Sequence, residues 1–170
     1  MKMTSAYANK LLKKLNEDKE FWRNKEHSGY LYTASLDEEP VIPDYDYATV
    51  AAEIEKIDDQ ICLIKHAINL ANVTSRIVVG DREMTVDEIL VRMAQLNKRK
   101  TVLDNMRKQS PKVRLCTSHF GQRKPAPEYQ FINYDLELVK AEYERIDCEI
   151  AEMQIALDKH NQTFEFDVAI

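Results

Sequence analysis

The sequence predicts a mainly α-helical protein with four long antiparallel helices, a bundle of two duplicated helical hairpins, and short β-hairpins or strands at the ends. Apolar residues recur at helical spacing over four long stretches. Only three Gly and five Pro occur in 170 residues, so long segments are free of helix breakers. Hydrophobic residues make up 44% and charged residues 31%, which is typical of amphipathic helices. The second half of the chain also resembles the first.

The first helix is expected to run from a cap at Thr4 or Ser5 to about Lys25, because both hydroxyl residues are good helix caps. Its apolar stripe consists of Tyr7, Leu11, Leu15 and Trp22. Residues 30–33 are then expected to form a short strand. Residues 37–44 are expected to form a loop, since two prolines there cannot sit inside a helix or a central strand.

The second helix is expected from about Asp46 to about Asn72. Its apolar residues alternate in steps of four and three, which is the heptad spacing of a helix that packs along another helix. They are Val50, Ile54, Ile57, Ile61, Ile64, Ile68 and Ala71. The seam therefore predicts a helical partner, and an antiparallel neighbour within the chain suits its length.

A β-hairpin is expected after the second helix. Residues 76–79 and 82–85 are its strands, and Gly80-Asp81 is a two-residue turn. Thr85 is followed by two acids, which favours a helix start there. This third helix is expected to stop by Ser110, because the next residue is proline. Its apolar face consists of Val86, Ile89, Met93, Leu96 and Leu103.

A second hairpin is expected from alternating polar and apolar residues at 112–117 and 128–132, with an exposed tip at 121–127. The fourth helix is expected from about 134 to 160, and a final strand covers 163–168. The helix has a second heptad seam, made of Val139, Tyr143, Ile146, Ile150, Met153 and Leu157. The side chains of the final strand that are expected to face one way are Phe164, Phe166 and Val168.

An internal repeat underlies this order of elements. Residues 45–79 align with residues 134–168 without a gap, at an offset of 89, and 13 of the 35 pairs are identical. The first and third helices also align, at an offset of 81. Similar heptads explain the matching isoleucines, but not the Tyr-Asp at both helix starts or the Asn-x-Thr at both ends. We therefore predict one domain, 1–170, whose two copies at 3–79 and 84–168 close a four-helix bundle.

The cysteines indicate a reducing compartment. Cys62, Cys116 and Cys148 are an odd number without CxxC spacing, and no secretory signal is recognisable. These features favour reduced thiols in a cytoplasmic protein. No apolar stretch approaches about 18 residues, so no membrane-spanning helix is expected.

Polar residues at the junction of the two copies form the first candidate site: Asn72, Thr74, Asp81, Arg82, Thr85, Asn161 and Thr163. Asn tolerates the left-handed conformation that ends many helices, so Asn72 and Asn161 are interpreted as caps in preference to functional groups. Asp81 and Arg82 are typical of a solvated turn. The alternative is a site where charged groups of the two copies meet.

A basic segment at 92–124 forms the second candidate site. It holds ten Lys or Arg and one acid, a charge of +9, while the rest of the chain carries −14. One expected partner is an external anion, either nucleic acid or an anionic surface. The overall charge of −5 favours instead pairing with the acidic helix residues at 53–59 and 142–152. The anion-binding candidates are Lys98, Arg99, Lys100, Arg107, Lys108, Lys112 and Arg114.

The histidines show no metal-binding or catalytic pattern. His27, His119 and His160 have neither a histidine four residues away nor a Glu-x-x-His partner. His66 on the second helix aligns with Ile155 on the fourth, which favours packing over catalysis. No metal, cofactor or catalytic residue is therefore expected, and a non-enzymatic role is favoured.

The junction also carries a family resemblance. Ile68-Asn-x-x-Asn72, a short strand and then Asp81-Arg-x-Met-Thr-x-x-x-Ile-Leu90 resemble the septicolysin-like family of uncharacterised bacterial helical proteins. That family tends to have Gly-Arg-Thr-Leu-Thr where this chain has Asp81-Arg-Glu-Met-Thr85. The resemblance implies a long-helix fold and, by the family's name, a suspected cytolysin.

Assembly is the function that these features favour. We expect a non-enzymatic cytoplasmic helical protein that forms a homo-oligomer or binds a protein partner through its helical faces. The alternatives are binding of nucleic acid or an anionic surface through residues 92–124, a septicolysin-like cytolysin, and an enzyme with its site at the 72–85 junction.

Overall fold

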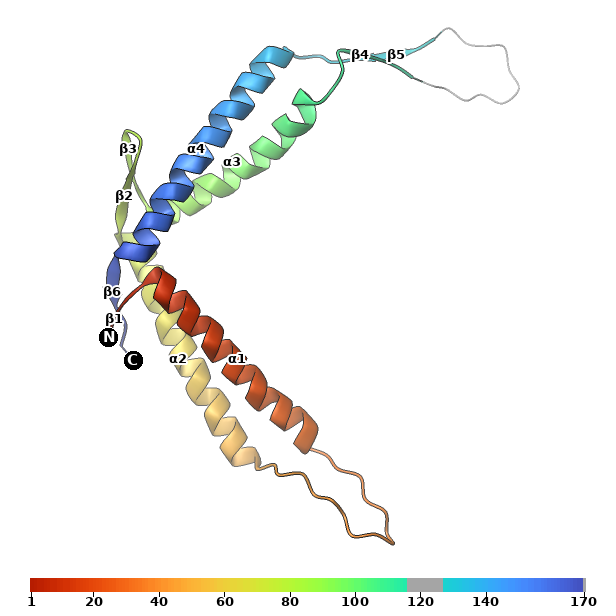
Figure 1. Cartoon of the computed structure of the whole chain (residues 1–170), viewed down its shortest axis with the longest axis vertical. Helices are drawn as coiled ribbons and strands as arrows, with labels where there is room; N and C mark the ends of the chain where they lie inside the picture. Colours follow the sequence, from red (N-terminus) through yellow and green to blue (C-terminus); the bar gives the residue numbers. More distant parts are fainter. Residues whose placement is uncertain (116–126, 170) are drawn as a thin grey trace, which may run out of the picture. The chain divides into compact units, whose positions relative to one another are not determined.

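Four helices and three short antiparallel pairs of strands make up the described chain (Figure 1). The computed structural model describes residues 1–115 and 127–169. The predicted mainly α-helical fold is confirmed. The chain divides into two compact units: the first holds Met1–Ile77 and Leu157–Ile170, and the second holds Val78–Ala156. The single domain and the repeat boundaries stay predictions.

The first unit is built on a helical hairpin. Its elements are β1 (Lys2–Thr4), α1 (Ser5–Gly29), α2 (Tyr47–Thr74), β6 (Glu165–Asp167) and the last turns of α4 (Leu136–Thr163). α1 and α2 lie side by side (Figure 1) and bury an apolar core. The core residues of this unit are Met3, Ala8, Leu12, Leu15, Ile57, Ile61, Ile64 and Val168.

α1 begins where the sequence predicts, and its buried face differs from the predicted stripe in the first turn. Thr4 is the N-cap, and its hydroxyl accepts a hydrogen bond from the Tyr7 amide at 3.2 Å. Tyr7 itself is exposed, whereas Ala8 and Leu12 are buried. The expected stripe is therefore wrong at Tyr7, whereas Leu15 is buried and Leu11 and Trp22 pack partly buried against the core.

The segment after α1 contains no strand between residues 30 and 33, so the strand expected there is wrong. α1 continues past Lys25 to Gly29. A Cβ atom at Gly29 would lie 2.5 Å from the Cβ atom of Tyr45. Glycine at this position therefore allows Tyr45 to approach the end of the helix.

α2 carries its heptad seam as predicted. Asp46 caps the helix by accepting hydrogen bonds from the Thr49 hydroxyl at 2.5 Å and amide at 2.8 Å. These two bonds lower the pKa of the Asp46 carboxyl. The predicted seam residues that are buried are Val50, Ile57, Ile61, Ile64 and Ala71, and those that are half-buried are Ile54 and Ile68. The seam is confirmed, and α2 ends at Thr74, two residues beyond the expected end.

The chain passes from the first unit to the second through a β-hairpin. β2 (Arg76–Val79) and β3 (Arg82–Thr85) pair with each other, and Gly80 in the turn has a φ of 60°. Glycine adopts this left-handed conformation without a steric penalty, and such turns join antiparallel strands tightly. The predicted hairpin is confirmed.

Two helices and a second hairpin belong to the second unit. α3 (Val86–Arg107) is followed by β4 (Lys112–Arg114), which pairs antiparallel with β5 (Tyr129–Phe131) before α4 begins. This hairpin is confirmed as well, and residues 121–126 of its expected tip lie outside the described residues. α3 ends before Ser110, as the following proline predicts.

Apolar and polar contacts join α3 to α4 within the second unit. The buried apolar residues on their faces are Val86, Ile89, Leu96, Leu103, Val139, Ile146 and Met153. Tyr134, just before α4, donates a hydrogen bond from its hydroxyl to the Met106 carbonyl at 2.7 Å. The Arg107 guanidinium lies 4.1 Å from the centre of the Tyr143 ring. The burial of these apolar residues agrees with the predicted faces of both helices, in which Met93, Tyr143 and Ile150 are half-buried.

β1 was not predicted, and it pairs antiparallel with β6. Met3 lies opposite Phe166, and the Val168 amide donates to the Met1 carbonyl at 2.8 Å. Met3 and Val168 are both buried. The two ends of the described chain are therefore tied together within the first unit.

Several contacts recur at the offsets of 81 and 89 residues that the repeat predicts. α2 and α4 also have the same bounds when shifted by 89 residues. The recurring contacts are the ion pairs Lys19–Asp58 and Lys100–Asp147 and the hydrogen bonds Asn16–Leu12, Asn97–Met93, Thr74–Leu70 and Thr163–Lys159. They support the duplication, which stays a prediction.

The seam between α1 and α2 should dominate the stability of the first unit. Ile64 is fully buried, so Ile64→Ala is expected to lower the free energy of unfolding by about 2–5 kcal/mol through lost burial and a residual cavity. Val73→Ala, at an exposed position of the same helix, should change it by about 0.5 kcal/mol. Urea unfolding followed by circular dichroism measures both, and equal effects would contradict this account of the seam.

Candidate functional site

The residues of the predicted junction site do not form one site. Asn72, Thr74, Asn161 and Thr163 belong to the first unit, and Asp81, Arg82 and Thr85 belong to the second. The first four lie in the last turns of α2 and α4. Asp81 lies in the turn between β2 and β3, and Arg82 begins β3.

The capping role expected for Asn72 and Asn161 is wrong. Both lie inside helices that continue for two more residues, and among the described residues only a glycine has a positive φ. The hydroxyls of Thr74 and Thr163 instead donate to the carbonyls four residues earlier, at 2.7 and 2.8 Å. The amides of Ser75 and Phe164 also make matching bonds, each at 2.9 Å. The two Asn-x-Thr ends thus make the same local hydrogen bonds, although Ser75 is buried and Phe164 is exposed.

Thr85 acts as a helix cap. Its hydroxyl accepts from the Glu88 amide at 3.2 Å, and the Glu88 carboxylate accepts from the Thr85 amide at 2.7 Å. This reciprocal pair is a capping box, which satisfies two backbone donors at the start of α3. The hydroxyl and amide of Thr85 are therefore both used in capping α3.

Asp81 and Arg82 line a charged depression of about 350 Å³ in the second unit. α3 and α4 supply the other side chains. The lining residues from these two helices are Arg92, Arg145, Cys148, Glu149, Glu152 and Met153. The sequence pointed to the turn residues and to pairing of the basic segment with the acids at 142–152, but it did not place Arg92 and Glu149 beside the turn.

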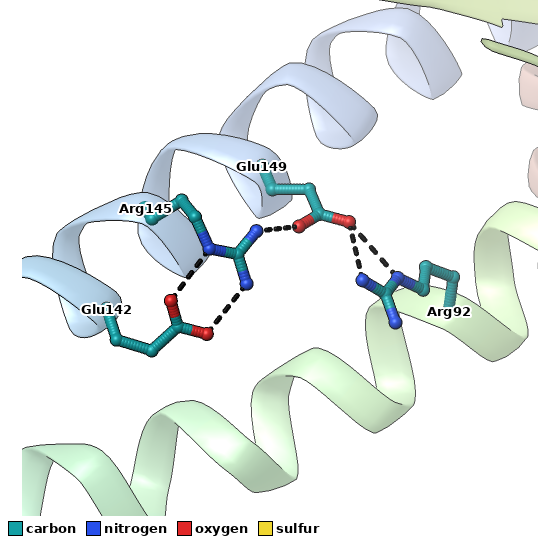
Figure 2. A network of polar contacts seen from close by, with 4 residues as sticks. All are labelled: Arg92, Glu142, Arg145 and Glu149. Atoms are coloured by element: carbon teal, nitrogen blue, oxygen red, sulfur yellow. Dashed lines mark hydrogen bonds and ion pairs between the residues drawn. The ribbon is translucent and has the colours of Figure 1, made fainter. Parts of the chain in front are cut away.

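A chain of arginine and glutamate side chains crosses from α3 to α4 beside this depression (Figure 2). Arg92 donates from Nε and Nη2 to one oxygen of Glu149, at 3.1 and 3.0 Å. Arg145 donates to the other oxygen at 2.9 Å. It also holds Glu142 through two bonds of 2.8 Å. Glu149 is therefore the bridge between the two helices.

The electrostatics of this chain favour full ionisation of its members. Burial raises the pKa of Glu149, but the hydrogen bonds and positive charges of Arg92 and Arg145 together outweigh burial, so the pKa is lowered. The bond from Arg145 likewise lowers the pKa of Glu142. Each acid is thus held as a carboxylate by an arginine. The arrangement provides a structural clasp, and it offers no carboxyl group with a raised pKa for acid catalysis.

Three of the seven anion-binding candidates are paired within the chain. Lys100 pairs with Asp147 on α4, and Arg107 and Lys108 both pair with Asp104 on their own helix. The bonds from Lys108 and then Arg107 lower the pKa of Asp104. The Lys100–Asp147 pair is of the predicted kind, because Asp147 lies in the acidic stretch at 142–152. Arg107 and Lys108 instead pair with Asp104, the acid inside the basic segment itself.

The remaining four candidates are exposed and make no ion pair with an acid of the described chain: Lys98, Arg99, Lys112 and Arg114. The charge of Arg99 still acts on Glu142, whose pKa it helps to lower. Arg123 and Lys124, at the end of the basic segment, lie outside the described residues.

An apolar groove of about 340 Å³ lies between α2 and the segment that follows α4, within the first unit. Its large apolar lining residues are Leu63, Leu70, Phe164 and Phe166. Leu63 and Leu70 remain 44% and 53% exposed, and Phe164 is 38% exposed. The Phe164 ring stacks on His160 at 4.6 Å. Sequence reasoning missed this groove, although the seven-residue spacing of the two leucines was a readable signal.

Two features that are absent from the described residues bear on the kind of site. No group of three or more His, Cys, Asp or Glu is placed to hold a metal ion. Across the same residues, no helix combines the length and apolar character needed to cross a bilayer.

Comparisons with known proteins identify a structural relative but no family. No protein-family model matches the chain, and no curated protein matches its sequence. The fold is similar to the crystal structure of a conserved protein of unknown function from Corynebacterium diphtheriae, with a TM-score of 0.64 and 14% sequence identity. The match covers 98% of this chain and 100% of that chain. At this identity the likeness shows a shared fold.

The ion pairs of Glu149 make the free energy of unfolding depend on pH in the acid range. Its folded-state pKa is lowered from 4.5, so its contribution is present above pH 4.5 and is lost as pH falls through the folded value. Glu149→Gln should therefore lower the unfolding free energy near neutral pH and flatten its decline below pH 4.5. Urea titrations at several pH values measure this. The control is Glu144→Gln, at an exposed position of α4, whose unfolding free energy should vary with pH as that of the wild type does. If the unfolding free energy of Glu149→Gln declines below pH 4.5 as steeply as that of the wild type, the clasp is contradicted.

Proposed function

We propose that the chain is a non-enzymatic helical protein that acts through self-assembly, with the groove on α2 as the contact surface. One observation carries this proposal: Leu63, Leu70 and Phe164 are all large, apolar and partly exposed around one groove. Exposed apolar surface of this kind is unfavourable in water and is removed when a partner covers it.

The position of the groove on α2 supports a protein partner. One face of α2 packs against α1 through Ile57, Ile61 and Ile64. A second apolar stripe on the same helix is formed by Leu63 and Leu70. At the matching positions of α4 the residues are Glu152 and Lys159. The stripe is thus a feature of α2 and is not required by the hairpin fold.

A second copy of the chain is the partner that fits most directly. Helical grooves commonly receive an apolar helical face, and α2 presents such a face at heptad spacing. Two copies placed with twofold symmetry would bring Leu63 and Leu70 of each against the other. His66, next to the stripe, would supply part of the polar rim that such interfaces have.

The cellular setting and the family are further parts of the proposal. The free, exposed thiols of Cys62 and Cys148 support a cytoplasmic location. The septicolysin-like resemblance rests on residues that lie at the end of α2, in the β2–β3 hairpin and at the start of α3. A cytolytic activity would follow from that resemblance alone, and leakage of dye-filled vesicles would test it.

Enzymatic activity and anion binding receive narrower support than self-assembly. An enzyme at the junction would use the charged depression, but Arg92, Arg145 and Glu149 are engaged with one another there. Anion binding by the basic segment is supported at Lys98, Lys112 and Arg114, which pair with no acid among residues 1–115 and 127–169.

Self-assembly predicts a solution mass of at least twice the chain mass of 19.8 kDa. Light scattering coupled to size exclusion at micromolar concentration measures it. Leu70→Glu should return the mass to 19.8 kDa, because a carboxylate cannot be buried unpaired in the contact. Leu138→Glu, which changes an exposed leucine on α4, should leave the assembly intact. A monomeric wild type, or an assembly that Leu70→Glu does not affect, would reject the proposal.

A further inference from the structure

The β4–β5 hairpin gathers basic and aromatic side chains on one face. Its register places Lys112 opposite Phe131 and Arg114 opposite Tyr129. Directly opposed residues of an antiparallel pair share a face, and so do alternate residues of each strand. The four side chains therefore lie on one face, and Val113 and Gln130 belong to the other.

The side chains on this face are in contact with one another. The Lys112 ammonium lies 4.2 Å from the centre of the Tyr129 ring and 5.5 Å from that of Phe131. The two ring centres are 6.5 Å apart. Lys112 thus lies over both rings through cation–π attraction, and charge and ring surface form one continuous patch.

This patch is not used by the core of the second unit. Every residue of both strands is exposed, and Tyr129 and Phe131 are 40% and 62% exposed. The hairpin is held by its backbone, with bonds such as Leu115 amide to Glu128 carbonyl at 2.9 Å. Within the described chain, neither Lys112 nor Arg114 pairs with an acid. The basic charge and the ring surface that Lys112 does not cover therefore remain open to an external partner.

We propose that this face binds single-stranded nucleic acid. Unpaired bases stack on exposed aromatic rings, and Tyr129 and Phe131 provide two such rings side by side. Lys112 and Arg114 on the same face are placed to contact the phosphates that link those bases. This binding goes beyond the proposed self-assembly, because it uses the second unit and a different chemistry.

The arrangement favours nucleic acid over a membrane surface. A hairpin that anchors in a bilayer keeps its cations at the headgroups while its rings sit deeper. Here Lys112 lies directly over the rings, and Gln130 lies opposite on the other face. Charge and ring faces are thus presented to the same ligand. A nucleotide strand alternates a flat base with a phosphate and matches that pattern.

Fluorescence anisotropy with a labelled oligothymidylate of about 15 nucleotides tests the proposal on the full chain. Binding is expected at about 50 mM salt and should weaken about sevenfold toward about 200 mM, as two phosphate contacts predict. Tyr129→Ala and Phe131→Ala should each weaken binding by about 5- to 150-fold, the range for loss of one stacked base. Tyr129→Phe keeps the ring and should retain binding. Lys112→Ala and Arg114→Ala should each reduce the slope of the salt dependence by about 0.7.

The controls separate this face from general charge attraction. Gln130→Ala changes the opposite face of the hairpin and should bind as the wild type does. A duplex of the same length should bind more weakly, since its bases are not free to stack. No binding at low salt, binding that salt does not affect, or unchanged binding by both ring variants would overturn the proposal. So would ring-dependent binding to phosphatidylserine vesicles without binding to the oligonucleotide.

Discussion

The burial of one apolar seam between two helices is the interaction on which each helical hairpin depends. A helix with seven-residue apolar spacing leaves a stripe that water disfavours until a second helix covers it. In the first unit, Ala8 and Ile64 are both fully buried in this seam. The cap at Thr4 begins α1, a helix that the seam stabilises. The Lys19–Asp58 pair lies at the exposed border, where solvent screening keeps its contribution small.

The placement of acids decides which basic groups are available to a partner. Glu149 and Asp147 on α4 engage Arg92 and Lys100, so much of the basic charge of α3 is used within the second unit. On the β4–β5 hairpin, by contrast, Lys112 lies over aromatic rings. Lysine and arginine therefore stabilise a helix pair in one place and face solvent in another. Net charge alone could not distinguish these two situations.

The two proposed surfaces complement each other physically. The groove on α2 is apolar and suits another helix, whereas the hairpin face is small, basic and aromatic. A face with two rings has a modest affinity for a nucleic acid on its own. Self-assembly would place several such faces on one particle, and a long strand bound by one face would meet the next at a high effective concentration. Each surface is nevertheless defined by its own residues.

The sequence by itself determined the four helices and two hairpins, because heptad spacing, capping residues and Gly80 are local signals. Only the tertiary structure decided the pairing of β1 with β6, the partner of Arg92 and the face shared by Lys112 and Tyr129. A three-residue strand has almost no local pattern, and its partner lies more than 160 positions away. Likewise, the register between α3 and α4 determines that Glu149 meets Arg92, and periodicity predicts that the helices pack without specifying that register.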